Sequence, residues 1–184
     1  VSVLSGICGE VTYFLNSGEM RFTGSDGSFA SGVYSRGSGN LSIYNMDTLI
    51  VSGGLGNNSI QDCIITSGLF LDCDGVNFKN IEIVSGFTVI NSLSNTITNI
   101  TATGYPLFYA SGCGDMSITS GVIKGSLSFK NCSGVYLAYL PIDTLSDYPI
   151  TLVSSSGFIL NHLTVYSPSS VGVSLAFSSG DINN

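Results

Sequence analysis

Charged side chains are scarce in this chain of 184 residues, at 9 % of the sequence, where a globular domain usually has about a quarter. Only five of them are basic, and these stand singly along the chain. Binding to nucleic acid depends on clustered lysine and arginine. With a net charge of −7, the sequence therefore predicts that nucleic acid is not a partner.

Other absences exclude further classes of protein. No apolar run approaches the roughly 18 residues that a transmembrane helix needs, so no membrane insertion is expected. One histidine and five cysteines without a Cys-x-x-Cys pair give no metal-binding pattern, and no cofactor is predicted. The cysteines are interpreted as buried free thiols that fill small apolar spaces: Cys8, Cys63, Cys73, Cys113 and Cys132.

What the chain does contain is an eight-residue pattern that recurs seven times. The copies begin at Leu41, Asn58, Val76, Asn95, Met116, Val135 and Phe158. Their starts are separated by 17, 18, 19, 21, 19 and 23 residues, and a regular repeat of about 20 residues is typical of a solenoid. Short segments rich in β-branched and aromatic residues, interrupted by Ser-Gly pairs, favour strands over helices. Stacked coils of this kind make a parallel β-helix.

Two positions of the pattern are occupied mainly by large apolar residues and predict the core. The third position holds Ile43, Ile60, Phe78, Ile97, Ile118, Leu137 and Leu160. The sixth position holds Met46, Cys63, Ile81, Ile100, Gly121, Leu140 and Leu163. The eighth position is mostly aliphatic as well. We expect the third position to form one continuous inward column.

The fifth position predicts a corner of the coil. Positions three and six have opposite parity, so a straight strand could not point both side chains inward. Four successive copies hold Asn45, Asp62, Asn80 and Asn99 at position five, and Asn and Asp tolerate left-handed backbone angles. Stacking sets equivalent side chains about 4.8 Å apart. We therefore predict a ladder of hydrogen-bonded side chains at a buried corner.

The pattern apolar-x-apolar-x-Asn-apolar-x-apolar, repeated in this way, resembles the right-handed parallel β-helix of the pectin-lyase-like superfamily. The Ser/Gly/Asn-rich composition and the few charges look most like bacteriophage tailspike and tail-fibre proteins. The resemblance covers residues 41–184 and implies about eight or more coils, a homotrimer, other virion tail proteins as partners, and binding or cleavage of a bacterial surface glycan. Residues 1–40 fit the pattern poorly and are interpreted as irregular first coils or a transition region. The β-helix at 41–184 is interpreted as a segment of a longer chain.

Candidate catalytic residues come from the densest group of acids, Asp72, Asp74 and Glu82. Glycan hydrolysis usually needs two carboxylates, about 5–5.5 Å apart for retention or about 6.5–9.5 Å for inversion of the sugar configuration. One coil would carry all three of these acids. The competing interpretation is that acids on the outer face of a solenoid serve solubility.

Candidate substrate-binding residues lie in and beside the insertion between Pro141 and Pro149. Longer loops on a solenoid are common binding sites, and Tyr139 and Tyr148 would offer aromatic platforms for a sugar ring. Asp143 and Asp147 accompany them. The competing interpretation is an ordinary exposed connection.

Three hypotheses of function follow. The first is a virion tail segment, a phage tailspike or tail fibre that binds, with or without depolymerising, a bacterial surface polysaccharide. The second is a secreted polysaccharide lyase or hydrolase. The third is a non-catalytic structural or adhesive β-helix on a cell surface. Scarce basic residues count against the second and five thiols against the third, whereas assembly in a reducing cytoplasm tolerates thiols.

Overall fold

The structure is a computed structural model, and it describes residues 2–5, 12–16, 20–23, 29–37, 41–53, 59–71, 74–104, 107–167 and 171–183. Side chains are described from Ser59 onward, except for some positions in the strand that begins there. The described residues form strands and contain no helix. The strands are β1 (Ser2–Ser5), β2 (Thr12–Asn16), β3 (Met20–Thr23), β4 (Phe29–Gly37), β5 (Leu41–Gly53), β6 (Ser59–Leu71), β7 (Asn77–Ile90), β8 (Thr96–Ala102), β9 (Leu107–Ser111), β10 (Ser117–Lys124), β11 (Ser126–Lys130), β12 (Tyr136–Ala138), β13 (Pro141–Asp143), β14 (Ile150–Val153), β15 (Ser156–Asn161), β16 (Thr164–Tyr166), β17 (Val173–Ala176) and β18 (Ser179–Asn183).

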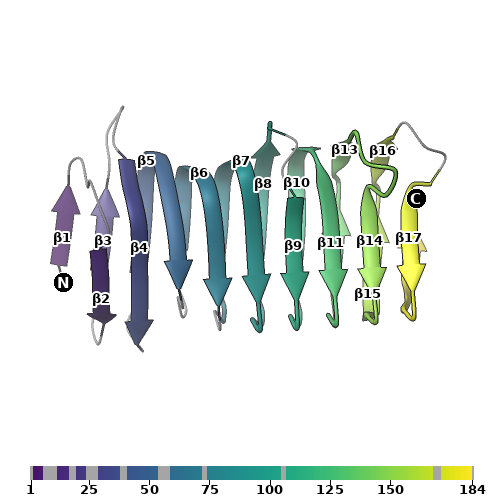
Figure 1. The fold of residues 1–184 in the computed structure, drawn as a ribbon, viewed down its shortest axis with the longest axis horizontal. Helices are drawn as coiled ribbons and strands as arrows, with labels where there is room; N and C mark the ends of the chain where they lie inside the picture. Colours follow the sequence, from purple (N-terminus) through teal and green to yellow (C-terminus); the bar gives the residue numbers. More distant parts are fainter. Residues whose placement is uncertain are drawn as a thin grey trace.

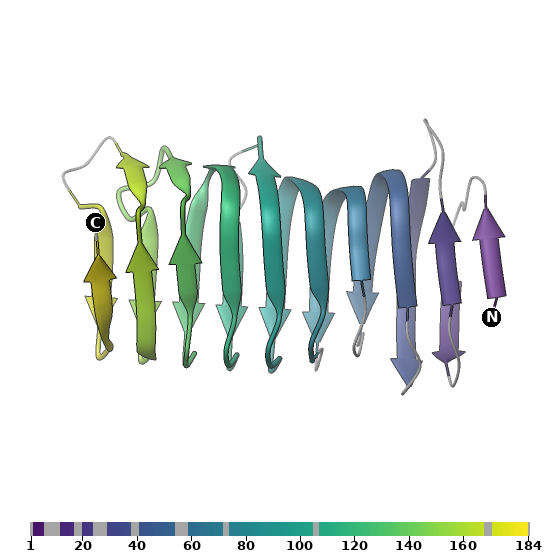
Figure 2. The ribbon, with the colours of Figure 1, turned by 180° about the vertical axis from the view of Figure 1, so that it is seen from behind.

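These strands stack along one axis from β1 at the N-terminal end to β17 and β18 at the C-terminal end (Figure 1). The opposite view shows the second wall of the same stack (Figure 2). Every strand pair is parallel, for example β10 with β8 and with β12. The part with described side chains contains about five turns of roughly 21 residues. The protein is therefore an all-β parallel solenoid, as the repeat predicts.

Alignment of the third position is confirmed residue by residue. Cα partners run from Ile43 to Ile60, Phe78, Ile97, Ile118, Leu137 and Leu160. From Ile60 to Leu160 each of these side chains is at most 1 % exposed. The side chain of Ile43 lies outside the described residues. The column continues to Ile182, whose side chain is 58 % exposed at the C-terminal end.

The corner at the fifth position is also confirmed. Asp62, Asn80 and Asn99 have φ angles of 54°, 53° and 57°. Beyond them Ser120, Tyr139 and His162 have 63°, 56° and 48°. One left-handed residue reverses the parity of the strand, so that Ile81 and Ile100 at position six are as buried as position three.

Gly121 is the exception at the sixth position. Its φ is +120°, and a Cβ built there would lie 2.6 Å from the Ile100 backbone nitrogen and would clash with the Ile100 carbonyl oxygen. The coil of Ser120 and Gly121 therefore turns its corner with two residues of unusual backbone conformation where the other described coils use one.

Two more left-handed columns run along the stack at the turns between strands. One contains Asn91, Gly112, Asn131, Ser154 and Phe177, and the other contains Gly75, Ser94, Asp115, Gly134 and Gly157. Three Ser-Gly pairs place their glycine in these columns, at Gly112, Gly134 and Gly157. Gly68 and Gly86 instead lie within strands β6 and β7, so Ser-Gly marks a turn at only some of its positions.

The interior contains a run of phenylalanine rings. Phe70, Phe78 and Phe87 contact one another with ring centroids 4.9–5.2 Å apart. Phe87 stacks on Phe108 at 5.1 Å, and Phe108 contacts Phe129 at 5.9 Å. These distances are those of favourable aromatic pairs, so the rings connect successive coils through the core.

Candidate functional site

The three predicted acids are not all described. Asp72 lies outside the described residues. Asp74 is exposed, and its Oδ1 accepts a hydrogen bond of 2.8 Å from the backbone N–H of Leu93 in the next coil. Glu82 Oε1 accepts one of 3.1 Å from Thr103 Oγ1, also in the next coil. Each described carboxylate therefore links neighbouring coils.

Asp74 precedes β7, and Glu82 lies within it. Between them the chain passes two left-handed residues, Gly75 and Asn80, with the first part of β7 in between. The peptide direction changes at each of these residues. A catalytic role for these acids stays a prediction.

The side chains at the corner form the expected ladder, but the corner is not buried. Asn80 Nδ2 donates to Asp62 Oδ1 at 2.7 Å, and Asn99 Nδ2 donates to Asn80 Oδ1 at 2.8 Å. All three residues are exposed. The prediction of a buried corner is wrong, because the left-handed residue directs its own side chain to solvent while its neighbours turn inward. Asn45 is in β5, and its side chain lies outside the described residues.

In the last coils the same corner carries aromatic rings. Tyr139 is 58 % exposed, and its ring stacks on the ring of His162 with centroids 5.1 Å apart and planes at 22°. His162 Nδ1 lies 2.7 Å from Asn161 Oδ1. This distance is that of a hydrogen bond between the two side chains. The corner thus changes from amides to stacked rings along the axis.

The loop between β13 and β14, residues 144–149, is held by hydroxyl groups. Thr144 is 4 % exposed, and its Oγ1 accepts from the backbone N–H of Ser146 at 3.0 Å. Ser146 Oγ accepts from the N–H of Tyr148 at 3.1 Å. This arrangement leaves Leu145 and Tyr148 directed outward, 73 % and 55 % exposed. Asp147 in the same loop is exposed as well.

Asp143 is exposed at the end of β13, beside a residue that the sequence interpretation missed. Its Cα partners are Lys124 in the preceding coil and Tyr166 in the following one, and Tyr166 is 62 % exposed. Tyr166 lies one residue beyond the eight-residue pattern and was therefore not aligned. Extending the pattern to a ninth position would have placed Lys124, Asp143 and Tyr166 in one outward column.

Two of the five cysteines are described as buried free thiols, as predicted: Cys113 and Cys132. Each donates to the carbonyl two residues earlier, at 3.4 and 3.3 Å, as the hydroxyls of Ser92 and Ser155 do in the same column. The hydrogen bond with Cys132 lowers the pKa of Cys113 to about 7, whereas this contact and burial raise the pKa of Cys132. The thiols therefore replace serine hydroxyls in a buried column.

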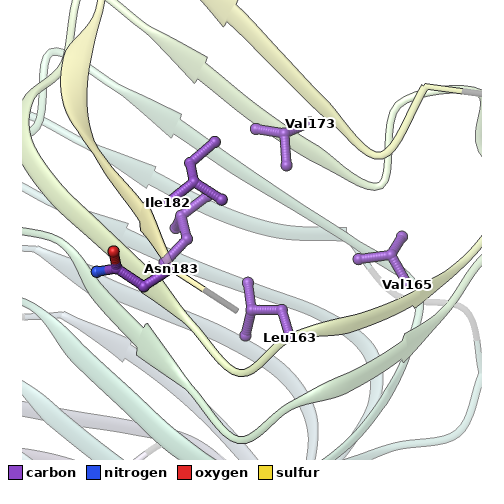
Figure 3. Close-up of a pocket in the computed structure, with 6 residues that line it drawn as sticks. Leu163, Val165, Val173, Ile182 and Asn183 are labelled. Atoms are coloured by element: carbon purple, nitrogen blue, oxygen red, sulfur yellow. The ribbon is translucent and has the colours of Figure 1, made fainter.

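An apolar pocket of about 250 Å³ lies at the C-terminal end of the stack, where Leu163, Val165, Val173, Ile182 and Asn183 surround it (Figure 3). Leu160 completes its lining. The apolar residues among these continue the interior columns, so the pocket lies at the C-terminal end of the described core.

Within the described ranges, no three histidine, cysteine, aspartate or glutamate side chains are grouped so as to hold a metal ion. No helix among these residues is long and apolar enough to cross a lipid bilayer. Comparison with known protein families, curated proteins and solved structures found no match for this chain.

Proposed function

We propose that the chain is a segment of a bacteriophage tailspike or tail fibre that binds a bacterial surface polysaccharide. In this proposal the fold is a right-handed β-helix of eight or more coils, of the pectin-lyase-like kind. It is located in the virion tail with other tail proteins.

The observation that carries the proposal is the set of exposed aromatic rings on the last coils. Tyr139, Tyr148 and Tyr166 are each more than half exposed, and the exposed carboxylates of Asp143 and Asp147 accompany them. Aromatic faces bind the C–H faces of sugar rings, and carboxylates accept hydrogen bonds from sugar hydroxyls. A rigid stack of parallel strands holds such groups at fixed spacing for an extended polymer.

Side-by-side trimerisation is part of the same proposal. Only 9 % of residues are charged, and a lone solenoid with so few charges would be prone to association. Three β-helices packed side by side would cover part of this surface and form grooves between chains.

Cleavage of the polysaccharide would rest on Asp72, Asp74 and Glu82. It requires two carboxylates within about 9.5 Å of each other. Asp74 and Glu82 each already bond a residue of the next coil. Binding is therefore the activity that the described geometry supports best.

The test uses the intact protein. Its mass is measured by sedimentation, and its binding is measured against a panel of immobilised smooth lipopolysaccharides and capsular polysaccharides. We expect a trimer that binds at least one polymer, with weaker binding by Tyr148→Ser. A monomer that binds none of these polymers would contradict the proposal and favour a structural or adhesive β-helix. If the parent protein releases new reducing ends from the polymer and Glu82→Gln does not, the protein also cleaves its ligand.

A further inference from the structure

We infer that the corner at Ser120 is a binding subsite for one neutral sugar ring, held between Asn99 on one side and Tyr139 on the other. The inference rests on the proposed function and gives it a specific place on the solenoid. This subsite is separate from the loop that carries Tyr148.

The first observation is the open end of the amide ladder. Asn99 Nδ2 donates to Asn80 Oδ1, and Asn80 Nδ2 donates to Asp62 Oδ1, so every amide donates toward the preceding coil. The acceptor oxygen of Asn99 is therefore left for the following coil. Ser120 occupies the corner of that coil, and within the described ranges neither it nor any other residue donates to Asn99 Oδ1.

The second observation is the free face of the Tyr139 ring. His162, in the following coil, covers one face of this ring at 5.1 Å. The other face is directed toward the preceding coil, where Ser120 is exposed and too small to cover it. Tyr139 therefore has the His162 ring against one face and an open space over Ser120 against the other.

The third observation is that Tyr139 is an unfavourable residue for this corner. Its φ of 56° is left-handed, a conformation that costs a bulky residue and suits Asn or Gly. The earlier coils turn the same corner with Asp62, Asn80 and Asn99. Since folding does not require a tyrosine here, the outlier points to a role in binding.

The size of the gap over Ser120 and the groups on either side of it indicate which ligand would fit. Asn99 and Tyr139 are two coils apart, about 9.6 Å at two strand spacings. A flat ring stacked about 4.5–5 Å from Tyr139 would lie midway, over Ser120. A hexopyranose has a C–H face for the tyrosine, and a hydroxyl group on its opposite face would donate to Asn99 Oδ1. A polymer bound in this way would cross the corner, because Asn99 and Tyr139 close the two ends of the gap along the long axis.

Two substitutions remove the subsite while keeping residues that suit the corner. Tyr139→Asn removes the ring. Ser120→Asn fills the gap, and its new amide would donate to Asn99 Oδ1 as Asn99 donates to Asn80. Tyr139→Phe keeps the ring and is the conservative control. His162→Asn is the matched control at the same corner, because it leaves Asn99, Ser120 and the free face of Tyr139 intact.

The probe is the same panel of lipopolysaccharides and capsular polysaccharides, with the intact protein, and the melting temperature is recorded for each variant. We expect Tyr139→Asn and Ser120→Asn to lose about tenfold or more in affinity without a lower melting temperature. Tyr139→Phe and His162→Asn should stay within about threefold. Parent binding that survives both Tyr139→Asn and Ser120→Asn would overturn the subsite and leave the proposed function standing. A parent that binds no polymer would overturn both.

Discussion

The middle coils and the last coils turn the same corner with different side chains. Asn80 and Asn99 form a hydrogen-bonded ladder, whereas Tyr139 and His162 form a stacked aromatic pair. Yet the φ angles of all four lie between 48° and 57°. The corner geometry therefore does not depend on amides.

What holds the corner is the stacking of backbones. Tyr139 N–H donates to Asn161 O at 3.2 Å, and His162 N–H donates to Asn183 O at 3.2 Å. Strands on both sides of the corner are paired in register with the neighbouring coils. The side chain at position five is thus free to serve stability in one region and recognition in the other.

The largest effect is expected at Gly121, between the two regions. Gly121→Ala should lower the free energy of unfolding by about 3 kcal/mol or more, because its φ and the nearby Ile100 backbone leave no room for a Cβ. Urea unfolding measures this. Gly172→Ala is the control, since nothing lies within 4 Å of its Cβ position. Equal unfolding midpoints for the two variants would show that the corner adapts more freely than this comparison implies.

The next effect compares one core position in two coils. Leu140 is fully buried, and Leu140→Ala should cost about 3 kcal/mol. Leu163 holds the same position one coil later but is only partly buried. Leu163→Ala should cost less than half as much. Denaturant titration of both variants checks this, and a larger loss for Leu163→Ala would indicate that the end of the core is covered in solution.

A smaller effect separates the ladder from the backbone angle. Asn80→Leu should destabilise by about 1–2 kcal/mol, because leucine is unfavourable at a φ of 53°. Asn80→Gly loses the same hydrogen bonds but tolerates the angle, so it should cost only about 0.5 kcal/mol. Calorimetry distinguishes the two, and similar losses would mean that the ladder itself stabilises the corner.

The smallest effect on stability is expected for Tyr139→Asn. Relief of the left-handed strain should offset the lost stacking on His162, so that stability stays level or rises by up to about 1 kcal/mol. Thermal unfolding measures this change. A clear drop in the melting temperature would mean that the aromatic pair is structural.

Much of the fold could be predicted because residues at the same position of successive repeats are paired in register in the stacked strands. Ile60 and Leu160 were aligned from the pattern alone, and the bend at Asn80 followed from the parity of its neighbours. The exposure of Asn80 could not be predicted, since the pattern shows where the chain bends and not which way the bending residue points. The repeat also does not show that Gly121 has a φ angle that other residues rarely adopt.

The candidate site was harder to predict for the same reason. Tyr139 was recognised as a possible platform, but its contact with His162 depends on the stacking of two corners. Asp74 and Glu82 were grouped from the sequence, but the pattern does not show that each carboxylate accepts a hydrogen bond from the next coil. Tyr166 was missed because the pattern was cut one residue short of it.

The uniform coil spacing has a consequence for how the chain folds. Partners along the third column are 18 to 23 residues apart from Ile60 to Leu160, so adding each coil closes a loop of similar length at a similar entropic cost. Folding can therefore nucleate where the phenylalanine rings are densest and propagate outward one coil at a time. Amide hydrogens should then exchange slowest near Phe87 and progressively faster toward β18, where no later described coil protects them.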